Sequence, residues 1–336
     1  MMCRHACIAW ALVCIVLTGG TASAQVTVSG NIDDTYPGYL DGYVATFPGT
    51  LQRGLTFHDS RPGTPGYPSR TATVRSGGGP GYVNGYGFVQ WIQKASDPNP
   101  NPESYGMTTT SSARATWNDI MVTGPAGPAM VPISVNLLLH GSFSFPISNV
   151  VDPFDLGWMQ YSSAGFSLLI NGELAANGNW GVRSDSSGPY LYFGGGVFAD
   201  FDGTYEGTSA VVMVPANTFF SIEMYLAVTA QFDIPLGGSA IIATVNNFTR
   251  TASFATNGPV FNLPAGYTAG SVEAGVTNNT FALCVCDWNY SGGINSQDFF
   301  DFLSDFFAAD ADFNNDALTN SQDFFDFLTC FLTGCP

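Results

Sequence analysis

The sequence predicts a mainly β protein, an antiparallel β-sandwich or jelly roll, followed by a small α-helical module. Two observations predict the sandwich. Apolar and polar residues alternate with the period of two that half-buried strands require, and the connections between these runs are rich in Gly, Pro and Asn. A third observation predicts the helical module, because an apolar motif with helical spacing occurs twice after residue 290 and no long helical period lies before it.

Residues 1–24 have the features of a signal peptide. The basic residue Arg4 precedes an uncharged apolar run over 6–17, and the small residues Ala22 and Ala24 form an A-x-A-like cleavage signal. The apolar run is shorter than the roughly 20 residues that a membrane-spanning helix needs. We therefore expect cleavage near Ala24, no membrane insertion, and a protein that is secreted or held at the cell surface.

Residues 25–283 are predicted to form the β-sandwich. Alternate positions are apolar in two clear runs, over 131–139 and over 220–228. Gly and Pro dominate 61–82, and the prolines of 97–102 exclude a helix or a central strand. The side chains predicted to face the core are Val131, Ile133, Val135, Leu137 and Leu139 in the first run and Phe220, Ile222, Met224, Leu226 and Val228 in the second.

One part of this region resembles a known group of proteins. The segment from Val245 to Ser271, with Leu263-Pro-Ala-Gly-Tyr-Thr-Ala-Gly-Ser271, resembles secreted bacterial sandwich proteins of the PEP-CTERM kind. The resemblance supports the fold class and carries no information about catalysis.

The predicted sandwich offers few candidates for catalysis. His58-Asp59-Ser60 contains the residue types of a catalytic triad, but neighbours in a strand point apart and do not converge. His140 follows an apolar strand and fits an edge position. The acidic residues of 200–206 suit a glycosidase carboxylate pair or a calcium loop, although Asp-Gly between apolar strands favours an ordinary hairpin. Four tryptophans would form a sugar platform if exposed, whereas burial in the core is favoured: Trp91, Trp117, Trp158 and Trp180.

Cysteines and acidic residues concentrate in residues 284–336. Of the seven cysteines, three lie in the predicted signal peptide. An even number in one small region of an exported chain predicts two disulfides, with the pairing left open. The net charge is −17, and residues 281–336 contain nine Asp but no Lys, Arg or Glu. This balance disfavours nucleic acid and anionic membranes and favours cations or basic surfaces. The four cysteines are Cys284, Cys286, Cys330 and Cys335.

A repeat with metal-ligand spacing lies between these cysteines. Ser296–Leu303 recurs without change as Ser321–Leu328, and an oxygen-rich loop precedes the helical part of each copy. Side-chain oxygens at loop positions 1, 3, 5, 9 and 12, with a backbone carbonyl at position 7, suit calcium, which takes six to eight oxygen ligands. The predicted ligands are Asp287, Asn289, Ser291, Gly293, Asn295 and Asp298 in the first loop and Asp312, Asn314, Asp316, Leu318, Asn320 and Asp323 in the second.

The paired loops, each with one following helix, resemble a type I dockerin, an EF-hand-like module. They are also similar to tails of planctomycete secreted proteins. The resemblance implies two bound Ca²⁺ ions and a cohesin-like partner. It places the partner-facing residues at loop positions 10 and 11, and identity between the copies would permit binding in two orientations related by a half-turn. The sequence departs from the family at Ala317, where Gly is usual, and at Thr319, where an apolar residue is usual. The implied partner-facing residues are Ser296, Gln297, Ser321 and Gln322.

The two helical copies are predicted to pack against each other. Each has an apolar arc that we expect to be buried between the helices, with an aromatic face that binds a partner as the alternative. A unit this small is seldom stable on its core alone, so calcium and the disulfides are expected to stabilise it. The arcs are Phe299, Phe300, Phe302, Leu303, Phe306 and Phe307 in the first copy and Phe324, Phe325, Phe327, Leu328, Phe331 and Leu332 in the second.

Two classes of function follow from the sequence. The first is a secreted non-catalytic protein whose calcium-binding module serves protein–protein assembly or attachment to a cell-surface scaffold. The alternative is a carbohydrate-active enzyme or a carbohydrate-binding module that carries a dockerin, with a polysaccharide as ligand. A facing pair of carboxylates across a cleft would favour the enzyme, and an exposed row of aromatic side chains on one sheet face would favour sugar binding.

Overall fold

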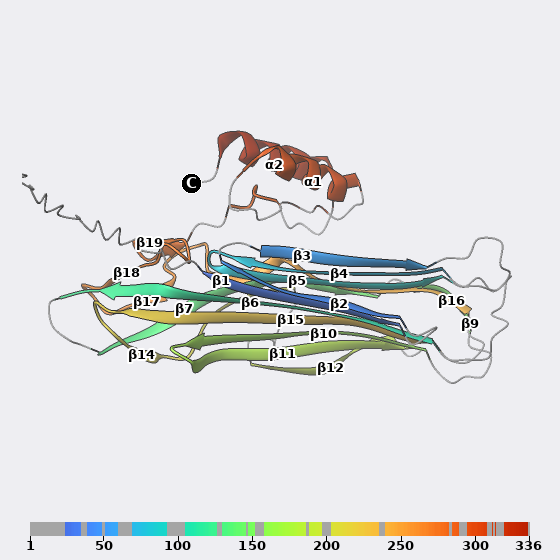
Figure 1. The fold of residues 1–336 in the computed structure, drawn as a ribbon, viewed down its shortest axis with the longest axis horizontal. Coiled ribbons are helices and arrows are strands. Elements are labelled where there is room, and N and C mark those ends of the chain that lie inside the picture. Colours follow the sequence, from blue (N-terminus) through green and yellow to red (C-terminus); the bar gives the residue numbers. More distant parts are fainter. Residues whose placement is uncertain are drawn as a thin grey trace, which may run out of the picture.

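The fold consists of two stacked antiparallel sheets and a pair of short helices that lie above β3 (Leu51–Asp59) (Figure 1). This arrangement comes from a computed structural model. The fold class predicted from the sequence is therefore confirmed. The described residues are 24–34, 39–48, 51–59, 69–92, 105–125, 130–145, 147–151, 158–185, 188–196, 203–234, 239–281, 284–288, 294–307, 311, 313 and 319–334.

The first sheet has eight strands in the order β12-β11-β10-β15-β6-β1-β2, with β18 also paired to β6. A two-residue turn, Asn171–Gly172, joins β10 to β11, and both residues have positive φ, 50° and 78°. Asn and Gly tolerate this backbone, which matches the twist of a tight hairpin. The strands are β1 (Gln25–Asp34), β2 (Tyr39–Pro48), β6 (Tyr105–Thr123), β10 (Met159–Ile170), β11 (Glu173–Asp185), β12 (Gly188–Gly196), β15 (Phe219–Ile234) and β18 (Thr268–Gly270).

The second sheet has ten strands, with the main order β13-β7-β16-β5-β4-β3. Strands β14 and β17 also pair with β7, and β8 and β9 also pair with β16. A separate two-stranded sheet joins β19 (Val276–Thr277) to β20 (Thr280–Phe281). The other strands of the second sheet are β4 (Ser69–Gly79), β5 (Tyr82–Ile92), β7 (Met130–His140), β8 (Ser142–Ser144), β9 (Ile147–Val151), β13 (Thr204–Thr208), β14 (Val212–Pro215), β16 (Ser239–Phe254) and β17 (Phe261–Asn262).

The predicted strand faces are confirmed. All side chains predicted to face inward from β7 and β15 are at most 3% exposed. Asp202, the first residue of the hairpin turn predicted at Asp202–Gly203, lies outside the described residues; the strands on either side belong to different sheets, β12 to the eight-stranded sheet and β13, paired with β7, to the other. Residues 1–23 lie outside the described residues, and β1 begins at Gln25, next to the predicted cleavage site.

The interior of the sandwich holds two apolar clusters with polar side chains between them. Along β6, Met107 belongs to one cluster and Ala113 to the other, while Ser111 lies between them. Ser111 Oγ donates to the carbonyl of Arg75 in the opposite sheet at 2.6 Å. Thr244 Oγ1 of β16 likewise donates to the carbonyl of Gln231 in β15 at 2.9 Å. These hydrogen bonds connect the two sheets where apolar packing is interrupted.

Candidate functional site

The two copies of the sequence repeat fold into α1 (Ser296–Phe307) and α2 (Ser321–Thr333). Asn320 caps α2: its side-chain oxygen accepts a hydrogen bond from the Gln322 N–H at 2.8 Å. Asn295 does the same for α1, accepting from the Gln297 N–H at 2.8 Å. These caps satisfy backbone donors that a helix otherwise leaves without a partner. The repeat therefore specifies where each helix begins.

A carboxylate completes the cap in each copy. Asp298 accepts the Asn295 N–H at 2.7 Å, and Asp323 accepts the Asn320 N–H at 2.8 Å. Asp323 uses its other oxygen to accept the Phe313 N–H at 2.7 Å, which ties the second loop to its helix. Both carboxylates are 0% exposed. Hydrogen bonds from backbone N–H groups stabilise a buried carboxylate and here fix its position at the base of the loop.

The polar side chain that follows each cap is also held in place. Gln297 Nε2 donates to Asp301 Oδ1 at 2.8 Å, and Gln322 Nε2 donates to Asp326 Oδ1 at 2.8 Å. Each pair is separated by four residues, which brings the two side chains together on one face of a helix. The predicted partner-facing residues Ser296, Gln297, Ser321 and Gln322 are all exposed.

The core of the module is built from equivalent residues of the two copies. The equivalent residues Phe302 and Phe327 are 0% exposed, and their rings stack at 3.9 Å with an interplanar angle of 1°. Another equivalent pair, Trp288 and Phe313, packs at right angles to these rings. The copies differ at this point because Trp288 Nε1 donates to Asp305 Oδ2 at 2.9 Å, a bond that a phenylalanine cannot make.

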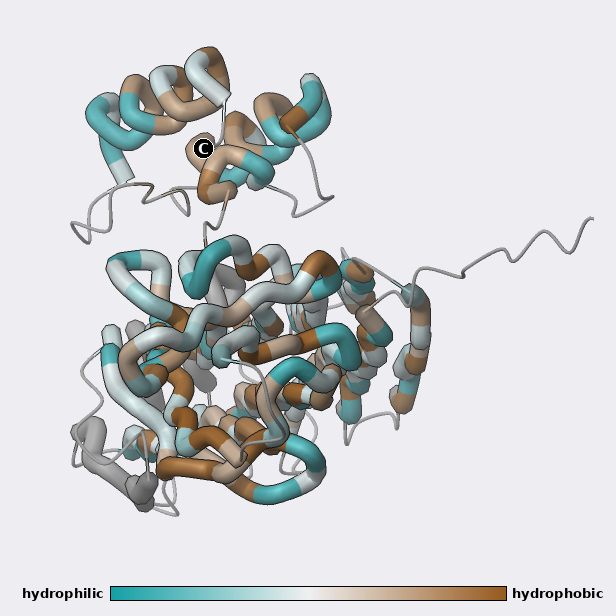
Figure 2. Tube along the Cα trace, turned by 90° about the vertical axis from the view of Figure 1, so that its left-hand side faces the viewer, coloured by the Kyte–Doolittle hydropathy of each residue, from teal (hydrophilic) through white to brown (hydrophobic). Residues whose placement is uncertain are grey.

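The prediction that the whole apolar arc of each helix is buried is wrong at four positions. Phe300 is 60% exposed and Phe307 is 81% exposed, and their equivalents Phe325 and Leu332 are 58% and 74% exposed. At about 100° per residue these positions lie at one edge of the arc. The facing helix covers only the other side, where Phe302 or Phe327 sits, so the arc was drawn too wide. Figure 2 shows brown apolar segments on both helices, beside the sandwich.

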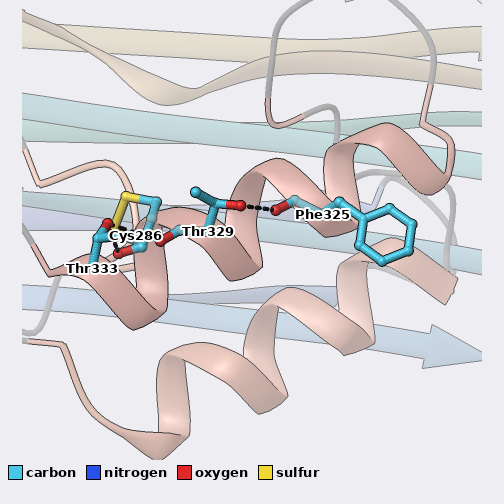
Figure 3. The surroundings of a disulfide bond; sticks show 5 residues. Cys286, Phe325, Thr329 and Thr333 are labelled. Atoms are coloured by element: carbon cyan, nitrogen blue, oxygen red, sulfur yellow. Dashed lines mark hydrogen bonds between the residues drawn. A yellow bond between two sulfur atoms is a disulfide. The ribbon is translucent and has the colours of Figure 1, made fainter.

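A disulfide joins the start of the first loop to the end of α2. Cys286 bonds to Cys330 across a sequence separation of 44 residues (Figure 3), which confirms a predicted bridge. Cys284 is also disulfide-bonded, and Cys335 lies outside the described residues. Beside the bridge, Thr333 Oγ1 donates to the carbonyl of Thr329 at 2.8 Å, within the last turn of α2.

Five of the predicted calcium ligands can be placed. Asp287 is 6% exposed and Asp298 and Asp323 are 0% exposed, whereas Asn295 and Asn320 use their side-chain oxygens as helix caps. Within the described part of the chain, no three His, Cys, Asp or Glu side chains are grouped closely enough to hold a metal. The other predicted ligands lie outside the described residues: Asn289, Ser291, Gly293, Asp312, Asn314, Asp316 and Leu318, together with the family departure Ala317.

The candidates in the sandwich lie only partly within the described residues. His58 is exposed on β3 and its Nδ1 lies 2.9 Å from Thr71 Oγ1, while Ser60 and Asp200–Asp202 lie outside the described residues. The predicted burial of tryptophans is confirmed for three of four, which are at most 9% exposed: Trp91, Trp117 and Trp158. Trp180 is half-buried and packs edge-on against Phe143 at 4.3 Å.

Comparisons with known proteins add no relative. No family model, no curated protein and no solved structure matches the chain. Among the described helices, neither is long and apolar enough to cross a membrane.

Proposed function

We propose that this protein is a secreted, non-catalytic β-sandwich whose carboxyl-terminal module is a calcium-binding, dockerin-like domain. The module attaches the sandwich to a cohesin-like domain or a cell-surface scaffold. The observation that carries the proposal is the pair of fully buried carboxylates, Asp298 and Asp323, at the same position of two matched loop–helix repeats.

Burial of these carboxylates supports a bound cation. An ionised carboxylate is costly to bury unless a counter-charge or several hydrogen bonds compensate it. Residues 281–336 contain no Lys or Arg, so the module has no basic side chain of its own for this purpose. Asp287, at position 1 of the first loop, adds a third carboxylate that is nearly buried. A Ca²⁺ ion would supply the missing positive charge.

The donor set also suits calcium. All the predicted ligands present oxygen, the element that this hard cation prefers. The Asn295 N–H donates a hydrogen bond to one carboxylate oxygen of Asp298, and the Asn320 N–H donates to one carboxylate oxygen of Asp323. Each carboxylate oxygen has further lone pairs for a metal. The ions would be held by Asp287, Asn289, Ser291, Gly293, Asn295 and Asp298 in one loop and by Asp312, Asn314, Asp316, Leu318, Asn320 and Asp323 in the other.

The partner surface would start at the exposed Ser-Gln pair of each helix. Gln297 and Gln322 are fixed by Asp301 and Asp326, so less side-chain entropy is lost when a partner binds them. The apolar residues Phe300 and Phe325 are exposed one turn beyond the serines. Exposed aromatic side chains of this kind are frequent anchors of protein–protein interfaces.

Calcium titration by calorimetry on residues 25–336, with the disulfides formed, tests the metal sites. We expect two binding events, one lost in Asp287→Ala and the other in Asp312→Ala. Asp326→Asn is the matched control, because it removes a carboxylate that lies outside both loops. A chain that binds no calcium more tightly than about millimolar would contradict the proposal, since even weak extracellular calcium modules reach this range.

A further inference from the structure

Two acidic residues from distant parts of the chain meet at one end of the sandwich. Asp119 lies near the end of β6, and Glu273 lies in the loop between β18 and β19, which are close together in Figure 1. This loop lies beside Asp119 because β18 pairs with residues 121–123 of β6. The loop also belongs to the last part of the sandwich before the chain enters the helical module.

A β-bulge directs Asp119 toward the loop. Where β6 pairs with β15, Trp117 is opposite Ile222 and Ile120 is opposite Phe220. The two residues 118 and 119 therefore share the position opposite a single residue of β15. A bulge of this kind changes the direction of a side chain relative to a regular strand.

Hydrogen bonds connect the bulge and the loop in both directions. Asp119 Oδ2 accepts the N–H of Val272 at 2.8 Å and that of Glu273 at 3.0 Å. Ser271 Oγ donates to Asp119 Oδ1. In return, Glu273 Oε2 accepts the Asn118 N–H at 2.7 Å. These crossed bonds hold both carboxylates where the loop meets the bulge.

The buried carboxylate of Glu273 has an oxygen without a partner. Glu273 is 7% exposed, and its Oε1 is buried and forms no hydrogen bond with the described residues. In the described part of the chain the basic side chains that form ion pairs do so with Glu223 and Asp185, and none pairs with Asp119 or Glu273. An ionised carboxylate is costly to bury without such compensation. A buried polar atom left unsatisfied in a native protein therefore points to a water molecule or an ion.

We propose that Asp119 and Glu273 bind a calcium ion on the sandwich, separate from the two sites proposed for the module. A water molecule could satisfy Oε1 but would leave two negative charges together, whereas Ca²⁺ neutralises both. The donors are all oxygen, which calcium prefers, and backbone carbonyls and water complete its six to eight ligands. The half-buried Asp119 leaves a solvent side for that water. The ion clamps the loop that precedes the module onto β6.

Calcium titration by calorimetry tests the site in the chain of residues 25–336. The background variant is Asp287→Ala/Asp312→Ala, which removes both proposed sites of the module. We expect one binding event to remain, with a dissociation constant of about 0.1–1 mM, because two carboxylates make a weak extracellular type of site. Glu273→Gln in this background should abolish the event. In the unaltered chain the event comes in addition to the two expected from the module.

Thermal unfolding of the sandwich gives a second readout. Calcium at about ten times the dissociation constant should raise the unfolding temperature by about 3–6 °C over a sample in EDTA at equal ionic strength. Glu273→Gln should lose this shift. In EDTA it should unfold at a higher temperature than the unaltered protein, because a neutral amide replaces an uncompensated charge. The order of the two proteins therefore reverses when calcium is added, whereas a purely structural role of Glu273 predicts a less stable variant in both conditions.

Glu223→Gln is the matched control. Glu223 is a half-buried glutamate of the same sheet that has its own counter-charge, Arg114 at 3.4 Å, so its loss should leave the calcium shift unchanged. Asp119→Asn is a second test variant and should lose the shift whatever its stability in EDTA. The proposal is overturned if the background variant binds no calcium, or if the shift persists in both Glu273→Gln and Asp119→Asn. Absence of the two module events with this one retained contradicts only the function proposed above.

Discussion

The sandwich and the helical module achieve a stable core by different means. The sandwich buries long rows of aliphatic side chains from two sheets, and its two apolar clusters include most of the inward positions of β7 and β15. Among the described residues of the module, four form the fully buried apolar core: Cys286, Phe302, Ala311 and Phe327. It adds a disulfide, two capped helices and, in our proposal, two calcium ions. A large β core distributes its stability over many side chains, whereas the module depends on a few.

The largest effect on stability is expected when one aromatic ring is removed from the core of the module. Phe327→Ala removes a 0%-exposed ring that stacks on Phe302 at 3.9 Å. Such a change costs about 3–5 kcal/mol, close to the whole stability of a unit this small. Scanning calorimetry without calcium should therefore lose the transition of the module and keep that of the sandwich. Phe325→Ala, at a 58%-exposed position of the same helix, is the control and should change little.

A sandwich transition that moves with Phe327→Ala would contradict this comparison. It would mean that the two regions unfold as one cooperative unit.

The second-largest effect on stability is expected when the disulfide is removed. Cys286→Ala/Cys330→Ala opens a loop of 44 residues, which costs about 2–4 kcal/mol when a second bridge remains. Hydrogen exchange followed by mass spectrometry should show faster exchange of the α1 and α2 amides and unchanged exchange of β7 and β15. Val285→Ala, at a half-exposed position beside the bridge, is the control. Unchanged exchange in both helices would show that packing alone holds them.

The sequence predicted the local features of both regions better than their long-range arrangement. The alternation of apolar and polar residues over 131–139 and 220–228 is a local property of each strand, and it correctly predicted which side chains face the core. The position of β15 between β10 and β6 depends on pairing between residues more than 50 apart, which no local pattern encodes.

In the module, the repeat predicted the two helices, and the even number of cysteines predicted disulfides without their pairing, one of which is Cys286–Cys330. The second role of Asp298 and Asp323, which accept the backbone N–H of the capping residue, was not predicted. The signal was present, because Asn-x-x-Asp at each helix start has the spacing of a capping box. The exposure of Phe300 and Phe325 was missed because a helical wheel shows which residues share an arc but not how much of that arc a partner helix covers.

The smallest effect is expected from a buried acid of the sandwich, which differs from the buried acids of the module. Asp298 and Asp323 accept backbone N–H groups, whereas Asp233 in β15 is half-buried and accepts a hydrogen bond from the Gln231 side chain at 2.9 Å. Burial raises the pKa of Asp233 above its ordinary value of 3.8, against a smaller opposing effect of the Gln231 hydrogen bond. The fold therefore favours the neutral form. This contribution is fully present below the unfolded pKa and is lost as the pH rises through the folded pKa.

Asp233→Asn should therefore stabilise the sandwich at pH 7 and have no effect below about pH 4, where the native carboxyl is already neutral. The gain should be less than about 1 kcal/mol, because solvent screens a group that is only half-buried. Denaturant unfolding of the sandwich at pH 7 and at pH 3.5 measures the difference. Asp41→Asn, on the exposed edge strand β2, is the control. A variant that is less stable at pH 7 would mean that the charge of Asp233 supports the sandwich, and that both regions use buried carboxylates in the same way.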